Sequence, residues 1–170
     1  MADLSPISVD NARGVALHLK GVRRVFAKSG SPVSEGQVVI SGFDLDVASG
    51  EFLAILGPSG CGKSTLLRMI ARLAEPNSGE IRMEPQVFRT AFVFQDAHLL
   101  PWQSVLDNAA LPLELQGVER LERYDKARAT LAQVGLADAE QKYPAELSGG
   151  MRMRVSLARA LVTEPHLLLM

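Results

Sequence analysis

The stretch that decides the fold of this 170-residue chain reads Gly57-Pro58-Ser59-Gly60-Cys61-Gly62-Lys63-Ser64-Thr65. It follows an apolar run at 52–56 and precedes apolar residues that recur at helical spacing over 66–73. Glycines adopt backbone angles closed to other residues, so successive N–H groups can turn inward around phosphate oxygens at the positive end of a helix. A strand, a glycine-rich loop and a helix in this order are typical of a P-loop, which binds a nucleotide triphosphate.

Lys63 and Ser64 give this loop its chemistry. A cation in the first turn of a helix opposes the helix dipole by roughly 0.3–1 kcal/mol, so Lys63 is well placed only if a polyanion binds beside it. Ser64 then offers its hydroxyl to Mg²⁺. The competing interpretation is a glycine-rich turn that contains a lysine by chance. Cys61 is interpreted as a small packed residue of the loop rather than a redox group.

Composition narrows the remaining classes of protein. With 47% apolar residues the chain can bury one substantial core, and we expect one domain with an attached subdomain. The net charge of −1 argues against nucleic acid as a partner, because such partners need a clustered basic surface. The single cysteine excludes an intramolecular disulfide, and no apolar run is long enough to cross a bilayer. We therefore expect a cytosolic chain that meets a membrane only through a partner.

The hydrophobic pattern predicts an α/β protein. Alternating apolar residues predict two antiparallel strands ahead of the P-loop strand, and helical periods dominate the second half. In chain order, the expected elements are strands at 15–26, 43–47 and 52–56, a helix over 66–73, strands at 80–83 and 90–95, a mostly helical insert at about 96–147, a helix to about 161, and a strand at 166–170.

A second motif distinguishes between the protein families that share a P-loop. The segment Leu147-Ser148-Gly149-Gly150-Met151 opens a helix, where Ser148 and the N–H groups of Gly149 and Gly150 can donate to phosphate oxygens. Taken alone, Ser148 could simply be an N-cap. Together with the P-loop, the motif resembles the signature of ATP-binding cassette (ABC) transporter ATPases, and the resemblance extends from about residue 15 to the last residue.

The resemblance implies a fold and its division along the chain. The expected fold is α/β: a P-loop NTPase core sheet of RecA-like type, an antiparallel N-terminal β-subdomain, and a helical subdomain at about 96–147. Residues 1–14 are expected to form an N-terminal tail, and 15–170 a partial ATP-binding domain, truncated at the C-terminus.

The resemblance also assigns roles to single residues. Gln95, at the end of an expected strand, matches the cassette glutamine that contacts Mg²⁺ or the attacking water; a polar strand end is the alternative. Phe26 falls where cassettes place an aromatic ring that stacks on adenine, although a lone strand Phe is more often part of a core. The run at 95–108 is similar to nitrate, sulfonate and taurine importers, in which Trp102 either faces a membrane subunit or anchors a turn.

Cofactors and partners follow from the same resemblance. The expected ligands are ATP, held by the P-loop and by Ser148, Gly149 and Gly150 of a second ATP-binding subunit in a head-to-tail dimer, and Mg²⁺, held by Ser64 and Gln95. The expected partners are a membrane permease subunit and, indirectly, a periplasmic or extracellular solute-binding protein. The expected location is the cytoplasmic side of the inner membrane, and the solute is chosen by the other subunits.

The chain departs from the cassette pattern in two places. Its final apolar strand stops before the aspartate and glutamate that cassettes use for Mg²⁺ and for the attacking water, so we expect ATP binding with little turnover. Met153 stands where a glutamine is usual. Two alternatives remain: a catalytically silent nucleotide-binding or permease-interacting module, and a small-molecule kinase or GTPase, which would need a base-reading Asn-Lys-x-Asp element or a kinase lid.

Overall fold

The computed structural model describes residues 15–26, 36–84 and 89–170. The predicted N-terminal tail, residues 1–14, lies outside the described residues. The chain divides into two compact units, Met1–Phe88 and Arg89–Met170, and each is described by itself.

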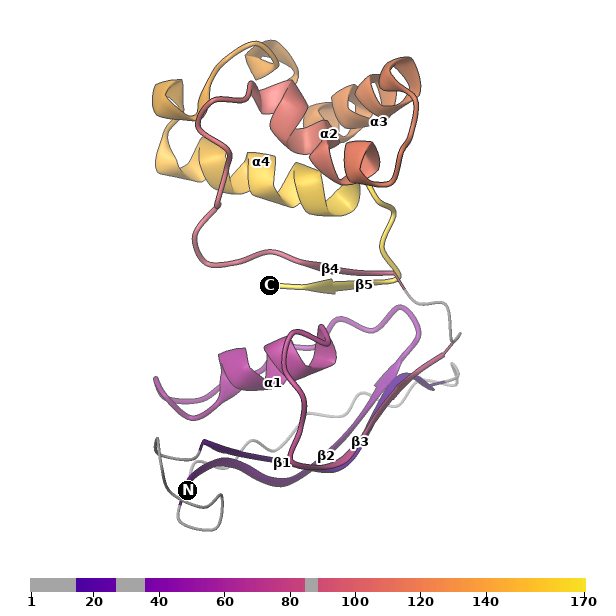
Figure 1. Ribbon diagram of the computed structural model, residues 1–170, viewed down its shortest axis with the longest axis vertical. Coiled ribbons are helices and arrows are strands. Elements are labelled where there is room, and N and C mark those ends of the chain that lie inside the picture. Colours follow the sequence, from indigo (N-terminus) through magenta and orange to yellow (C-terminus); the bar gives the residue numbers. More distant parts are fainter. Residues whose placement is uncertain (1–14, 27–35, 85–88) are drawn as a thin grey trace. The chain divides into compact units, whose positions relative to one another are not determined.

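The first unit contains a three-stranded antiparallel sheet. Its strands are β1 (Val15–Phe26), β2 (Gln37–Ala48) and β3 (Ser78–Met83) (Figure 1). They pair in the order β2-β1-β3. Leu19 of the central strand is paired with Leu45 on one side and Ile81 on the other. Alternate residues of a strand face opposite sides of a sheet, so Leu17 and Leu19 are buried while Lys20 is exposed. The predicted antiparallel N-terminal strands are thereby confirmed.

Helix α1 (Lys63–Ile70) belongs to the same unit and buries Leu66, Met69 and Ile70. The sequence predicted a helix as far as residue 73, and the structure ends it three residues earlier. Arg72 adopts a left-handed conformation (φ 57°). In this conformation the Arg72 N–H donates to the Met69 carbonyl, and the Leu73 N–H donates to the Arg68 carbonyl. This 6→1 pairing satisfies the last carbonyls of the helix and stops its growth.

The predicted strand at 52–56 is wrong for this structure. The segment forms no strand, and Phe52 and Leu56 are 86% and 74% exposed. A strand exists only where a neighbour accepts and donates ladder hydrogen bonds. The sheet of the first unit ends at β2 and β3 and takes up 52–56 at neither edge.

The second unit contains a pair of parallel strands. Strands β4 (Thr90–Phe92) and β5 (Leu167–Leu169) pair with Thr90 opposite Leu167 and Phe92 opposite Leu169. The predicted strand at 90–95 is therefore shorter than expected, since only one further ladder bond follows, from the Val93 N–H to the Leu169 carbonyl. Parallel strands need a long crossover connection, and here the connection is helical.

The crossover supplies the core of the second unit. It contains α2 (Val105–Leu115), α3 (Arg120–Gln133), the short 3₁₀ helices η2 (Ala137–Ala139) and η3 (Pro144–Glu146), and α4 (Gly149–Leu161). Figure 1 shows α2 and α3 gathered on α4. The helices share one set of buried apolar side chains, including Val105, Ala109, Leu113, Ala127, Leu131, Val155, Ala158 and Val162.

Candidate functional site

The glycine-rich loop leads into a helix that begins without a side-chain cap. Gly62 is the N-cap of α1 and provides no side-chain acceptor, whereas Ser104, Glu119 and Ser148 accept first-turn N–H groups of α2, α3 and α4. The first intrahelical bond runs from the Leu66 N–H to the Gly62 carbonyl. The N–H groups ahead of Leu66 therefore have no intrahelical acceptor, which is the arrangement that suits an added anion.

Two glycines of the loop are required by its geometry. Gly60 and Gly62 have φ values of +82° and +106°, which L side chains rarely adopt. A Cβ at position 62 would lie 3.0 Å from Val39 Cγ1 of β2. Residues 57–60 are exposed, so the loop presents its backbone outward.

The Lys63 ammonium is held at this loop by main-chain carbonyls. Nζ donates to the Gly57 oxygen at 2.8 Å and to the Pro58 oxygen at 2.9 Å, and it lies 3.7 Å from Cys61 Sγ. No acidic residue occupies the first turn of α1. The positive charge therefore adds to that of the helix N-terminus, and the two together can bind a polyanion.

Ser64 and Thr65 complete the first turn of α1. Ser64 is exposed and Thr65 is half-buried, so the Ser64 hydroxyl is accessible to a ligand at the loop. Mg²⁺ bound with a nucleotide takes most of its ligands from phosphates and water and one or two from protein oxygens. A single accessible hydroxyl beside an anion cradle fits that requirement. In the described ranges no cluster of three or more His, Cys, Asp or Glu side chains forms a metal site.

Phe26 lies at the end of β1 and is 47% exposed. The Arg24 guanidinium lies 4.9 Å from its ring centroid and donates to the Glu75 carbonyl at 2.6 Å. Residues i and i+2 of a strand share a face, so this cation–π pair could have been read from the spacing, and Arg24 was missed. The accessible ring is compatible with stacking on a base, which stays a prediction.

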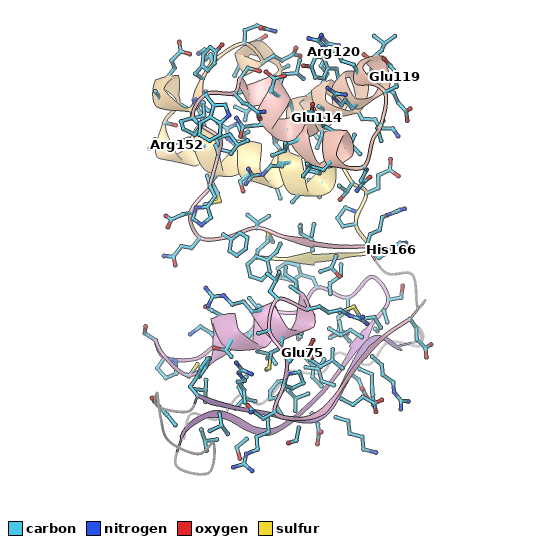
Figure 2. The ribbon with its side chains drawn as sticks, in the orientation of Figure 1. Glu75, Glu114, Glu119, Arg120, Arg152 and His166 are labelled. Carbon is cyan, nitrogen blue, oxygen red and sulfur yellow. The ribbon has the colours of Figure 1, made fainter. Side chains whose placement is uncertain are left out.

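The signature turn begins α4. Ser148 Oγ accepts the Met151 N–H at 3.3 Å, as an N-cap does. A Cβ at Gly149 or Gly150 would meet nothing within 4 Å, and neither residue has positive φ. Neither conformation nor packing therefore requires glycine at these two positions, and their part in a ligand site stays a prediction. Arg152, on the first turn of the same helix, is exposed (Figure 2).

Gln95 follows β4 and is exposed, in the second unit. The loop after it turns sharply, because His98 has φ +44° and its ring lies 5.6 Å from that of Phe94. The predicted site residues thus divide between the units. The P-loop and Phe26 belong to the first; Gln95, Ser148, Gly149 and Gly150 belong to the second.

A polar network that the motifs did not predict lies between the start of α2 and α3. Asp107 accepts hydrogen bonds from the Ser104 and Tyr124 hydroxyls, both at 2.6 Å, and so joins α2 to α3. Burial alone would raise the pKa of Asp107, but these hydrogen bonds and the nearby charge of Arg120 lower it below its usual value. The hydrogen bond to Asp107 raises the pKa of the Tyr124 hydroxyl. The Ser-x-x-Asp spacing at a helix start was the available signal.

Comparison with known sequences gives consistent matches. The family described as ABC transporter matches residues 40–170. The aliphatic sulfonates import ATP-binding protein SsuB of Cupriavidus necator is 47% identical over 167 residues, which cover 94% of this chain and 50% of that protein. SsuB 1 of Paraburkholderia xenovorans is 53% identical over 135 residues, which cover 78% of this chain and 38% of that protein. The chain thus spans about half the length of the curated relatives it matches, or less.

Solved structures give the same result for the fold. The post-hydrolysis dimer of the ATP-binding cassette MJ0796 bound to ADP and Pi aligns with a TM-score of 0.79 and 30% identity, covering 89% of this chain and 72% of that one. The cbiO1 protein of Clostridium perfringens aligns with a TM-score of 0.78 and 25% identity, covering 91% and 64%. The α/β cassette fold is thereby confirmed. None of the helices in the described residues has the length and apolar character needed to span a bilayer.

Proposed function

The chain belongs to the ABC transporter family, and from this premise we propose that it is the ATP-binding subunit of an importer, coupling ATP binding and hydrolysis to solute uptake. The proposed location is the cytoplasmic side of the inner membrane, on a permease subunit. A second ATP-binding subunit completes each nucleotide site, and a solute-binding protein outside the membrane delivers the cargo.

The observation that carries the proposal is the uncapped start of α1 with a lysine beside it. Gly62 leaves the first-turn N–H groups without a side-chain acceptor, and Lys63 Nζ is held at the same loop by two carbonyls. A helix N-terminus and an ammonium together favour a bound polyanion. The β- and γ-phosphates of ATP supply that charge.

The remaining residues have defined parts in this site. We assign Gly57, Pro58, Ser59, Gly60, Cys61 and Gly62 to the phosphate-facing backbone, Ser64 and Gln95 to Mg²⁺, and Thr65 to the helix start. Phe26 supports adenine; Ser148, Gly149 and Gly150 serve the nucleotide held by the other subunit. Bound Mg²⁺ neutralises charge on the phosphates. Gln95 orients the attacking water, and Lys63 stabilises the charge that develops during transfer.

Titration with a fluorescent ATP analogue and Mg²⁺ tests the binding step. Lys63→Met keeps the length of the side chain and removes its charge, and it should weaken binding about tenfold or more, since a charge-assisted hydrogen bond contributes about 1.5–3 kcal/mol. Arg68→Met is the matched control, because it removes an exposed cation from the last turn of the same helix. Equal losses in the two variants, or none in Lys63→Met, would refute a phosphate site at this loop.

The proposed solute class is aliphatic sulfonates. It rests on the relatives named as aliphatic sulfonates import ATP-binding proteins, at 43–53% identity. Proteoliposomes that contain the full-length protein with its permease, with the solute-binding protein added outside, should accumulate an alkanesulfonate only when ATP is enclosed in their lumen. Uptake of nitrate but not of the sulfonate would correct the solute class, and binding of ATP without any uptake would favour the silent nucleotide-binding module.

A further inference from the structure

Arg159 contacts the loop that follows Gln95. It lies on α4, and its guanidinium donates to the Ala97 carbonyl at 2.7 Å through Nη2 and to the His98 carbonyl at 2.9 Å through Nη1. Two nitrogens of one planar group therefore bind two consecutive carbonyls. This fork fixes the direction of the loop as well as its distance from the helix.

The surroundings of Arg159 indicate that this contact is its main role. The side chain is half-buried, and burial lowers the pKa of its guanidinium. Arginine keeps its charge in proteins. The ion pairs found among the described residues do not include Arg159. A partly buried cation without a carboxylate partner among the described residues needs strong acceptors, and the two carbonyls are those acceptors.

The loop itself has a shape that needs an external support. His98 is in the left-handed region (φ +44°), which is uncommon for a residue other than glycine. The chain bends at Gln95 and Asp96, and the rings of Phe94 and His98 lie 5.6 Å apart on the two sides of this bend. Such a conformation persists only where its environment holds it, and the Arg159 guanidinium binds the carbonyl of His98 itself.

We propose that Arg159 is a positioning residue, which ties the Gln95 loop to α4 so that the location of Gln95 follows that of the helix begun by Ser148. Its significance for hydrolysis rests on the proposed function. Arg159 is assigned to neither the nucleotide nor the attacking water; it acts through the backbone of residues 97 and 98. A movement of the signature turn along its helix axis would thereby be transmitted to the residue assigned to the attacking water.

Hydrogen–deuterium exchange on the full chain tests the tether directly. Arg159→Gln removes the charged fork, and exchange within residues 96–100 should become at least about tenfold faster, because two charge-assisted bonds that oppose local opening are lost. The Leu100 amide, which donates to Asn108 Oδ1, is the main reporter. Arg159→Lys keeps the charge but cannot reproduce the fork, so it should give an intermediate rate. Exchange in α2 and α3 should be unchanged.

Arg154→Gln is the matched control. Arg154 lies on the same helix and also donates to two carbonyls, those of Val134 and Gly135 at 3.1 and 3.3 Å. Its loss should accelerate exchange around residues 135–137 and leave residues 96–100 unchanged. Unchanged exchange at 96–100 in Arg159→Gln would overturn the proposal. So would equal acceleration throughout the second unit, which would show a general structural role.

Steady-state kinetics test whether Arg159 affects ATP hydrolysis through Gln95. In the full-length ATPase, Arg159→Gln should lower kcat with little change in KM, and Gln95→Ala should lower kcat no further when combined with it. Fully additive losses would contradict action through Gln95. If the protein fails to hydrolyse ATP at all, the proposed function is refuted, and the exchange rates, which need no nucleotide, still decide whether the tether exists.

Discussion

Gly79 of β3 lies against Gly21 of β1 so closely that a Cβ at position 79 would come within 2.3 Å of the Gly21 carbonyl oxygen. Both glycines have positive φ, +88° and +59°. Because the two backbones can approach here, the regular pairing of β3 with β1 continues from the next residues, where Lys20 lies opposite Glu80. The position of β3 therefore depends on the absence of one methyl group.

Gly79→Ala should destabilise the first unit by on the order of 3 kcal/mol, because overpacking against backbone adds to the cost of a left-handed alanine. Gly21→Ala is the control, since its added Cβ meets nothing within 4 Å and only the backbone cost of about 1–2 kcal/mol remains. Urea unfolding followed by circular dichroism measures both. Equal effects would show that the close approach is not rigid.

Gly150→Ala should separate stability from function. The residue lies in the first turn of α4 with open space around it, so alanine should raise the free energy of unfolding by up to about 1 kcal/mol. ATP-dependent dimerisation, measured by light scattering, should weaken because the added methyl group covers the surface that we assign to the nucleotide of the other subunit. A variant that is more stable and dimerises normally would remove Gly150 from the site.

Asp107 should make the second unit sensitive to acid. Burial would raise the pKa of its carboxyl, but the Ser104 and Tyr124 hydrogen bonds lower it below the usual 3.8. A carboxylate with a lowered folded-state pKa adds stability above its unfolded pKa, and this contribution is lost as pH falls through the folded value.

The stability difference between wild type and Asp107→Asn should accordingly be constant above about pH 5 and shrink below about pH 4. Thermal melts from pH 3 to 7 measure it, and Asp125→Asn, a change of an exposed carboxylate on α3, serves as the control. A difference that does not vary with pH would show that the negative charge of Asp107 does not contribute to stability.

Asn108 holds the turn that carries Trp102. The Asn108 side chain is fully buried; its amide nitrogen donates to the carbonyls of residues 100, 103 and 104, and its oxygen accepts the N–H of residue 100. Asn108→Asp places a carboxylate against those carbonyls and should cost about 3 kcal/mol. Gln116→Glu makes the same change at an exposed position of the α2 C-cap and should cost little.

Trp102 reports on this turn, since it is the chain's single tryptophan and is 72% exposed. Its fluorescence anisotropy should fall in Asn108→Asp and stay constant in Gln116→Glu. Unchanged anisotropy together with normal stability would show that the turn is held by other contacts.

Local chemistry was the part of this protein that its sequence predicted well. Gly62 before Lys63 indicated a helix start, and Ser148 before two glycines indicated another, because caps and turns depend on residues a few positions apart. The strand character of β1 and of the second half of β2 followed from alternation in the same way. These signals are complete within a short window.

Features that depend on distant partners were not predicted. The apolar run at 52–56 has the composition of a strand, yet it finds no ladder neighbour in the first unit. The contact between Arg159 and the carbonyls of residues 97 and 98 joins positions about sixty apart, and main-chain acceptors leave no trace in sequence. Helix α1 ended early because Arg72 took a conformation usually left to glycine.

The Gly57 and Pro58 carbonyls, which accept hydrogen bonds from Lys63 Nζ, already order the flexible Lys63 side chain before any ligand binds. A four-carbon side chain loses rotamer freedom once it is ordered, and here that loss accompanies folding instead of ligand capture. The loop proposed to bind phosphate is therefore preorganised, and ordering of the Lys63 side chain should add little to the entropy cost of nucleotide binding.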